Sequence, residues 1–443
     1  MSLQAADLAR LLIAITLALI VAHIVGRIFS VLRQPPVIGE ILGGLLLGPT
    51  VLGLIAPRVG TSLFPPSGVV ATGFGVLSEL GLLLLMFLSG REVLTYRNPG
   101  QQRTVVAVTV TGLVIPFAVG VVAAQFVDYT SFSGPHGNAV TFALVFSIAI
   151  AVTSIPVISR IMLDLNILHT KFARVVLSVA LLEDLVLYVV LAVVLGMAQS
   201  KSNTIFGLWS LFHNNTTNAT TAYYVIANLV FFAIFMPLGK PLFTGLARSR
   251  FNVVELRSPI AFRLVFLLAL VLVCVFLGIN PIFGALLAGI ASASADSYTG
   301  DEARRHEIEQ AWDAIKKFSL ALFIPLYFAG VGIQLDLVHH FTVLFFLGFI
   351  LLACVTKSLS VWLGARLAGE SNRSAVNFAV ALNARGGPGI VLATVTLSAG
   401  VINRDFFTTL VVLSIVTSQF AGLWLQHTVT PKLSTVRSGG SPT

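Results

Sequence analysis

The chain has 443 residues, of which 56% are apolar and 10% are charged, and its formal net charge is +9. Soluble domains carry about 25% charged residues, so the composition excludes a soluble globular protein. Apolar stretches of roughly 20 residues, long enough to cross the hydrocarbon core of a bilayer, recur from Leu8 to His427. The sequence predicts a single membrane domain over residues 1–431, followed by a short cytoplasmic tail at 432–443.

Thirteen membrane-spanning helices are predicted, which makes the expected fold all-α and polytopic. In chain order they cover residues 9–31, 36–56, 72–93, 104–126, 140–163, 172–198, 221–246, 260–278, 279–295, 318–335, 341–365, 376–399 and 406–428. The polar stretch 292–317 is expected to be a connector, with a solvated helix from Asp301 to Lys317.

The basic residues orient these spans. Of the 27 Lys and Arg residues, 21 fall in loops on one side, and two, Lys357 and Arg385, fall inside spans. The loops on the other side hold four: Arg10, Arg58, Lys201 and Arg404. The positive-inside rule therefore places the N-terminus outside and the C-terminus in the cytoplasm. The net positive charge orients the chain and gives no indication of nucleic-acid binding. We expect a bacterial inner membrane.

Two spans contain helix-breaking residues. The fifth includes AVTSIPV at 151–157, with Pro156 near its middle, and the twelfth includes NARGGPG at 383–389, with Gly386, Gly387 and Pro388. Such residues interrupt a helix, and unwound backbone survives at membrane depth only where protein or water satisfies it. A simple proline kink is the alternative for the fifth span alone. Two interrupted helices of opposite direction indicate an inverted-repeat transporter with its site where they cross.

Four charged residues lie near the same depth as these interruptions. Helix geometry places Glu183 and Asp184 roughly 18 Å, and Lys357 roughly 14 Å, from the cytoplasmic ends of their spans. Arg385 lies in the twelfth span, and Thr153 and Ser154 lie in the fifth. Ionisable residues inside a membrane are rare and costly, so each is a functional candidate. The alternative is a buried ion pair with a structural role only.

The chemistry of these residues suggests exchange of a cation for a proton. Loss of hydration favours the neutral form of a carboxyl group, so one carboxylate can hold either a proton or a small cation. We expect Asp184 to face a monovalent Na⁺ or K⁺ ion with help from Thr153 and Ser154, and Glu183 to face Lys357 or a neighbouring polar group. Arg385 is expected to neutralise helix C-terminal ends at the crossing.

Four segments resemble the second monovalent cation:proton antiporter family, which includes Kef-type, NapA-type and CHX-type exchangers. The most specific segment is RQPPVIGEILGGLLLGPTVLG at 33–53. Supporting segments are ELGLLLLMFL at 79–88, GINPIFGALLAG at 278–289 and IPLYFAGVGIQLD at 324–336. The resemblance extends over nearly the whole chain.

The resemblance implies a NhaA/NapA-like fold of thirteen helices and a homodimer. It implies a transport core that includes about 104–198 and 341–428, moving against a dimerisation scaffold. It assigns the essential aspartate to Asp184 and the core lysine to Lys357. Two departures are Glu183, where the family usually has Asn, Asp or Gln, and the Ser89-Gly-Arg91 step before Glu92. The short segment after Gln426 implies no nucleotide-binding regulatory domain in this chain.

Other functions remain open on sequence alone. A sodium-coupled symporter of an organic solute on a related fold is the main alternative, and a non-transporting receptor is a third reading. No nucleophile–base pair, metal cluster or phosphate loop indicates an enzyme. No cofactor is expected, because Na⁺ or K⁺ and H⁺ are the cargo. The two cysteines, Cys274 and Cys354, lie in apolar runs and are expected to pack.

Overall fold

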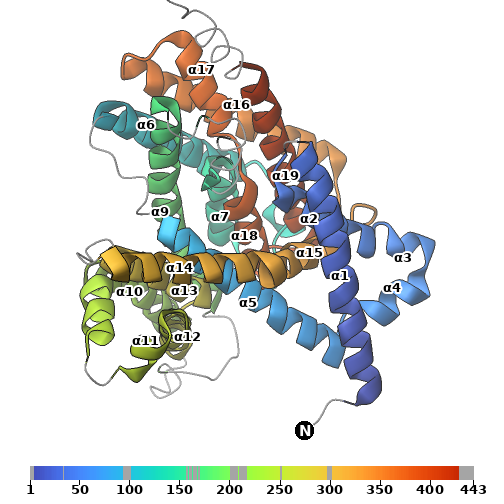
Figure 1. Ribbon diagram of the computed structural model, residues 1–443. Coiled ribbons are helices and arrows are strands. Elements are labelled where there is room, and N and C mark those ends of the chain that lie inside the picture. The colour runs from blue at the N-terminus through green and yellow to red at the C-terminus, as the bar shows by residue number, and fades with distance from the viewer. Residues whose placement is uncertain are drawn as a thin grey trace, which may run out of the picture. The chain divides into compact units, whose positions relative to one another are not determined.

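The computed structural model describes residues 4–32, 34–92, 101–155, 158, 162, 167, 170–199, 208, 217–249, 252–296 and 302–428. Within these ranges the secondary structure is helical apart from one isolated bridge between Ser133 and Ile402. The chain forms two compact units. Figure 1 labels their helices.

The first unit comprises residues 1–25, 40–95 and 192–335. Its helices are α1 (Ala5–Val31) and α2 (Pro36–Leu47), each in part, then α3 (Leu52–Ile55), α4 (Pro57–Leu63), α5 (Val69–Glu92), α10 (Thr217–Ala247), α11 (Val253–Arg257), α12 (Pro259–Leu277), α13 (Pro281–Asp296), α14 (Glu302–Phe318) and α15 (Ile324–Gln334). Local signals set several boundaries. For example, α12 begins with the Ser258 cap and Pro259 and ends at Gly278, which adopts φ +72°.

The second unit comprises residues 26–39, 96–191 and 336–443. Its helices are α6 (Gln102–Ala124), α7 (Ala139–Ala151), most of α9 (Lys171–Gln199), α16 (Val343–Leu367), α17 (Asn372–Ala381), α18 (Gly386–Ser398) and α19 (Arg404–Thr428). α6 packs between α7 and α16, and α18 packs against α19. This unit contains all the candidate site residues that the structure describes.

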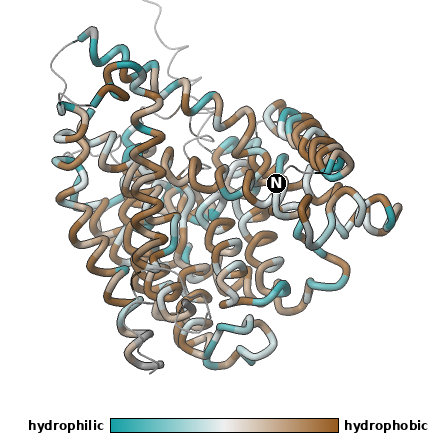
Figure 2. Tube along the Cα trace, turned by 90° about the horizontal axis from the view of Figure 1, so that it is seen from below, coloured by the Kyte–Doolittle hydropathy of each residue, from teal (hydrophilic) through white to brown (hydrophobic). Residues whose placement is uncertain are grey.

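Hydrophobic residues dominate most of the helical segments (Figure 2). In the part of the chain that is described, eleven helical segments are long and apolar enough to cross a membrane. Two shorter apolar helices, α7 and α13, fall in the regions of the fifth and ninth predicted spans. The all-helical polytopic fold is thus confirmed, whereas the count of thirteen spans stays a prediction.

The helix expected at the end of the polar connector is less exposed to solvent than predicted. Ser292–Asp296 belong to α13, and α14 continues through a π-helical turn at Ser319–Phe323 into α15, so that the two form one long helix in Figure 1. One face of α14 is buried through Ile308, Ala311, Trp312 and Ile315. The Trp312 indole donates to Asp296 over 2.8 Å. Burial of these apolar side chains, which charge interleaving alone did not indicate, holds α14 against the unit.

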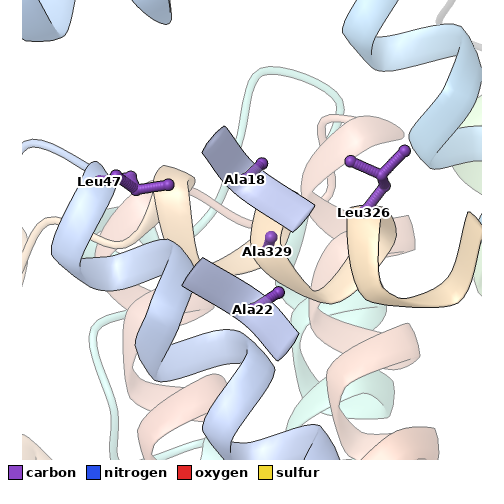
Figure 3. Close-up of a cluster of buried hydrophobic side chains, with 5 residues drawn as sticks. All are labelled: Ala18, Ala22, Leu47, Leu326 and Ala329. Atoms are coloured by element: carbon purple, nitrogen blue, oxygen red, sulfur yellow. The ribbon is translucent and has the colours of Figure 1, made fainter. Parts of the chain in front are cut away.

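Glycines of the 33–53 segment serve close helix packing in the first unit. A Cβ atom on Gly44 of α2 would collide with the carbonyl oxygen of Ala329 in α15, and one on Gly332 would collide with that of Ile41. Close approach of backbones through small residues is the usual basis of helix association in membranes. Beside this crossing, Ala18 and Ala22 of α1 lie against Ala329, with Leu47 and Leu326 on either side (Figure 3).

Gly44→Ala is expected to destabilise the protein by about 1–3 kcal/mol, because the new methyl group meets rigid backbone. Gly75 in α5 is the matched control, since nothing lies within 4 Å of a Cβ built there. Gly75→Ala should be neutral or stabilising by up to ~1 kcal/mol through helix propensity. Thermal unfolding of the two variants in detergent measures the difference. Equal midpoints would contradict close packing at Gly44.

The unusual Ser89-Gly-Arg91 step also has a structural explanation. A Cβ on Gly90 would collide with the carbonyl oxygen of Leu286, and one on Gly289 with that of Phe87, so α5 and α13 cross at a glycine pair. The next residue, Arg91, places its guanidinium carbon 4.8 Å from the centre of the Trp312 ring. Gly90 therefore permits the crossing, and Arg91 forms a cation–π contact with α14.

Candidate functional site

The first interruption follows α7. This helix begins with a capping box at Asn138 and ends at Ala151, after which Val152 is extended, with φ −65° and ψ 143°. Val152–Ser154 are non-helical and buried. The predicted breaker, Pro156, lies outside the described residues. A proline at this position has no N–H to offer the carbonyl group four residues earlier, which disfavours a helix through Val152.

The second interruption separates α17 from α18. The chain leaves helical geometry after Ala381 and resumes at Gly386, which adopts φ +30°. Gly386, Gly387 and Pro388 were expected to be unwound, but they form the first turn of α18. A first turn tolerates proline, because its N–H groups lack partners within the helix.

The two interruptions cross each other. The Ser154 N–H donates to the Ala384 carbonyl over 2.7 Å, and the Gly387 N–H donates to the Ser154 hydroxyl over 3.2 Å. The Gly386 N–H donates to the Ser418 hydroxyl of α19. These three N–H groups are thus satisfied by protein, as membrane depth requires. Thr153 and Ser154 lie at this crossing and are fully buried.

Glu183 and Lys357 form a buried ion pair beside the crossing. The Lys357 ammonium lies 2.9 Å from Glu183 Oε1, and both side chains are 0% exposed. The Thr153 hydroxyl lies 2.7 Å from Glu183 Oε2 and 2.8 Å from the Leu382 carbonyl oxygen. Lys357 also donates to two backbone carbonyl groups, those of Gly112 and Ala151. This is the neighbour expected for Glu183, and it ties α9 to α16 and to both interruptions.

Asp184 differs sharply from its neighbour. Asp184 is 7% exposed, and its buried Oδ1 atom has no hydrogen-bond partner in the described part of the chain. A buried carboxylate oxygen without a donor is costly. Adjacent residues on a helix point about 100° apart, which explains how Glu183 is fully paired while Asp184 is not. Of the two adjacent acids, Asp184 therefore has an oxygen atom that no donor in the described chain satisfies.

Arg385 binds the backbone on both sides of the crossing. Its guanidinium donates to the carbonyl oxygens of Ala149 and Ile150, at the end of α7, over 3.0 Å each. It also donates to the Ala353 carbonyl and to both oxygens of Asn383. Helix C-terminal carbonyl groups lack partners and carry partial negative charge. The contacts match the predicted neutralisation of helix ends.

Two residues of this site were missed from the sequence. Gly112 of α6 leaves room for the ion pair, since a Cβ there would lie 2.8 Å from Glu183 Oε1. Asn383 accepts from Arg385 and donates to the Ser358 hydroxyl over 2.7 Å. Asn383 was visible in the interrupted motif, but Gly112 lies in an ordinary apolar span and carries no local signal except the proline four residues later.

A second buried acid lies elsewhere in the chain. Glu40 of α2 is 9% exposed, and its Oε2 atom has no hydrogen-bond partner in the described ranges. Glu40 lies in the first compact unit and is not part of the site described above.

An all-helical membrane fold with two interrupted helices that cross beside buried charges defines a secondary transporter. Residues 15–430 match the family model described as sodium/hydrogen exchanger, transmembrane. The chain belongs to this family. The match supports the expected relationship to monovalent cation:proton antiporters. The members compared are transporters, not enzymes.

Individual relatives agree with this assignment. The chain is 27% identical over 416 residues to K(+)/H(+) antiporter 1 of Saccharomyces cerevisiae, covering 91% of this chain but 44% of that protein. It is 27% identical over 405 residues to Na(+)/H(+) antiporter NhaS4 of Synechocystis, covering 90% and 92%. The fold is similar to that of the sodium proton antiporter MjNhaP1 of Methanocaldococcus jannaschii, with a TM-score of 0.62, 16% identity, and coverage of 95% and 98%.

Proposed function

We propose that the protein exchanges Na⁺ or K⁺ for H⁺ across a membrane, with cation and proton competing for Asp184. The observation that carries the proposal is the buried Asp184 Oδ1 atom, which has no hydrogen-bond partner in the described chain and lies next to the paired Glu183. Relatives named as Na(+)/H(+) and K(+)/H(+) antiporters support exchange over solute symport.

Charge balance supports the same conclusion. Lys357 and Glu183 neutralise each other, so the charge on Asp184 is free to be met by cargo. A bound proton and a bound monovalent cation each neutralise this carboxylate. Both loaded forms of the site thus have the same net charge, whereas an empty site leaves the Asp184 carboxylate buried with no donor to its Oδ1 atom in the described chain, which is costly. This difference favours movement of the loaded site and couples the two ions.

The oxygen atoms at the crossing, beside Glu183, are suited to a hard monovalent cation. Thr153 and Ser154 supply hydroxyl groups at the crossing, and the interrupted helices supply carbonyl groups. Oxygen donors are the usual ligands of hard cations. We assign Asp184, Thr153 and Ser154 to the cargo site. Glu183, Lys357 and Arg385 hold its charged surroundings in place.

The proposal extends to topology and assembly. The distribution of basic residues favours an external N-terminus, a cytoplasmic C-terminus and a bacterial inner membrane. The resemblance to dimeric antiporters favours a homodimer, with the second unit containing the transport core. Accessibility of single cysteines introduced at Asp128 and at Glu370, in loops assigned to opposite sides, tests the topology.

Reconstitution into liposomes that contain a pH-sensitive dye tests the function. With an acidic interior, added external Na⁺ or K⁺ should raise the internal pH, and the more effective ion identifies the preferred cargo. Choline chloride at equal concentration is the control, because choline is too large for a site built from one carboxylate and two hydroxyl groups. If neither Na⁺ nor K⁺ moves protons at any pH tested, exchange is excluded and solute symport becomes the leading function.

A further inference from the structure

We propose that Pro116 is a positioning residue, which frees the Gly112 carbonyl group to hold the Lys357 ammonium against Glu183 and away from Asp184. Pro116 lies inside α6, eight residues before its end, and is buried. It is not among the residues assigned to the cargo site. The role assigned to it in transport rests on the function proposed for Asp184.

The first step concerns the hydrogen bonds of α6. In an α-helix the carbonyl group of residue 112 accepts from the N–H of residue 116. Proline has no N–H, so the Gly112 oxygen lacks its partner within the helix. The Lys357 Nζ atom occupies this position, 2.8 Å from the Gly112 oxygen. A buried carbonyl group requires a partner, and this one is met by a side chain from α16.

The second step concerns the other contacts of the same ammonium. Nζ lies 2.6 Å from the carbonyl oxygen of Ala151, the last residue of α7. Carbonyl groups at a helix C-terminus also lack intrahelical partners. The third contact is Glu183 Oε1 at 2.9 Å. An ammonium has three protons, and all three are used. Two of its three acceptors are carbonyl groups that lack a donor in their own helix. The Gly112 carbonyl lacks one because of Pro116, and the Ala151 carbonyl lacks one because α7 ends there.

The third step is the consequence for the cargo site. Lys357 also lies within electrostatic range of Asp184. A loosely held lysine would compete with Na⁺ or K⁺ for the Asp184 carboxylate. Three hydrogen bonds fix Nζ at Glu183 instead. Gly112 also leaves room for this ion pair, because a methyl group there would lie 2.8 Å from Glu183 Oε1 and 3.8 Å from Nζ.

The test compares two replacements of Pro116. Pro116→Ala supplies an N–H that competes for the Gly112 oxygen. The α-hydroxy analogue of alanine at the same position, introduced as a backbone ester, has neither the N–H nor the proline ring. With Na⁺ and K⁺ as probes, we expect Pro116→Ala to raise the half-saturating cation concentration roughly tenfold, the effect of one charge-assisted hydrogen bond, with a smaller change in maximal rate. The ester should remain near wild type.

A second measurement does not depend on transport. Alanine is a better helix former than proline. In a background in which Lys357 is replaced by Met and Glu183 by Leu, Pro116→Ala should therefore raise the thermal unfolding midpoint. In the wild-type background the gain should be smaller or reversed, because the Lys357 contact is weakened. Pro237→Ala in α10 is the matched control and should have the same effect in both backgrounds.

The outcomes separate the two proposals. Equal effects of Pro116→Ala in both backgrounds, or an ester as impaired as alanine, would overturn the positioning role while leaving exchange through Asp184 intact. If Pro116→Ala has different effects in the two backgrounds but the protein moves no cation, the positioning of Lys357 stands and its proposed benefit to transport does not.

Discussion

Asp184→Asn is expected to abolish cation-driven proton movement, reducing it to the level of protein-free liposomes. Asparagine has nearly the same shape as aspartate, but its amide neither carries a negative charge nor takes up a proton at physiological pH. The replacement breaks no hydrogen bond at Oδ1, because that atom has no partner in the described chain. The folded protein should therefore survive, with an unfolding midpoint within about 3 °C of wild type.

The matched control is Asp128→Asn. Asp128 is an exposed acid in the same compact unit, where it caps a short turn through Thr130 and Ser131. Its replacement removes the same charge without touching the crossing, and exchange should continue. Full activity of Asp184→Asn would show that the carrier is another carboxyl group, and Glu183 would be examined next.

Lys357→Met is expected to reduce the free energy of unfolding by about 3–5 kcal/mol, which is typical when one partner of a buried ion pair is removed. Among the described residues, Glu183 would then hold a charge at 0% exposure with Thr153 as its remaining side-chain donor, and the Gly112 and Ala151 carbonyl groups would lose a partner. Thermal unfolding measures this loss. It is monitored through the reaction of the Cys274 thiol, which is buried in the folded protein, with a fluorogenic maleimide.

A compensating variant distinguishes charge from packing. Glu183→Leu combined with Lys357→Met removes both charges and leaves no carboxylate to neutralise, so it should recover more than half of the stability lost in Lys357→Met. If the double variant is as unstable as the sum of its single changes, the pair contributes by shape and not by charge. Asp184 remains in both proteins, so any residual exchange can be measured in the same preparations.

The amino-acid sequence by itself determined the class of the protein and indicated the charged residues of its candidate site. Apolar length and the scarcity of charge predict membrane helices because lipid offers no partner for an exposed backbone group. For the same reason, acids and bases inside spans stand out, which indicated Glu183, Asp184, Lys357 and Arg385. The helix breakers near 151–157 and 383–389 indicated the crossing, although the second break proved to lie just before the glycines.

Tertiary structure alone decided which groups meet. Glu183 and Asp184 are adjacent and chemically alike, and only the packing of α9 makes one fully paired and leaves an oxygen of the other without a donor. The sequence could not place Gly112 beside Lys357, 245 positions away. It could not show that Lys357 fills the position that Pro116 leaves open at the Gly112 carbonyl group, or that a glycine pair lets α5 and α13 cross. Each is a contact between distant segments. Local sequence shows which groups need a partner, but only the tertiary structure shows which group supplies it.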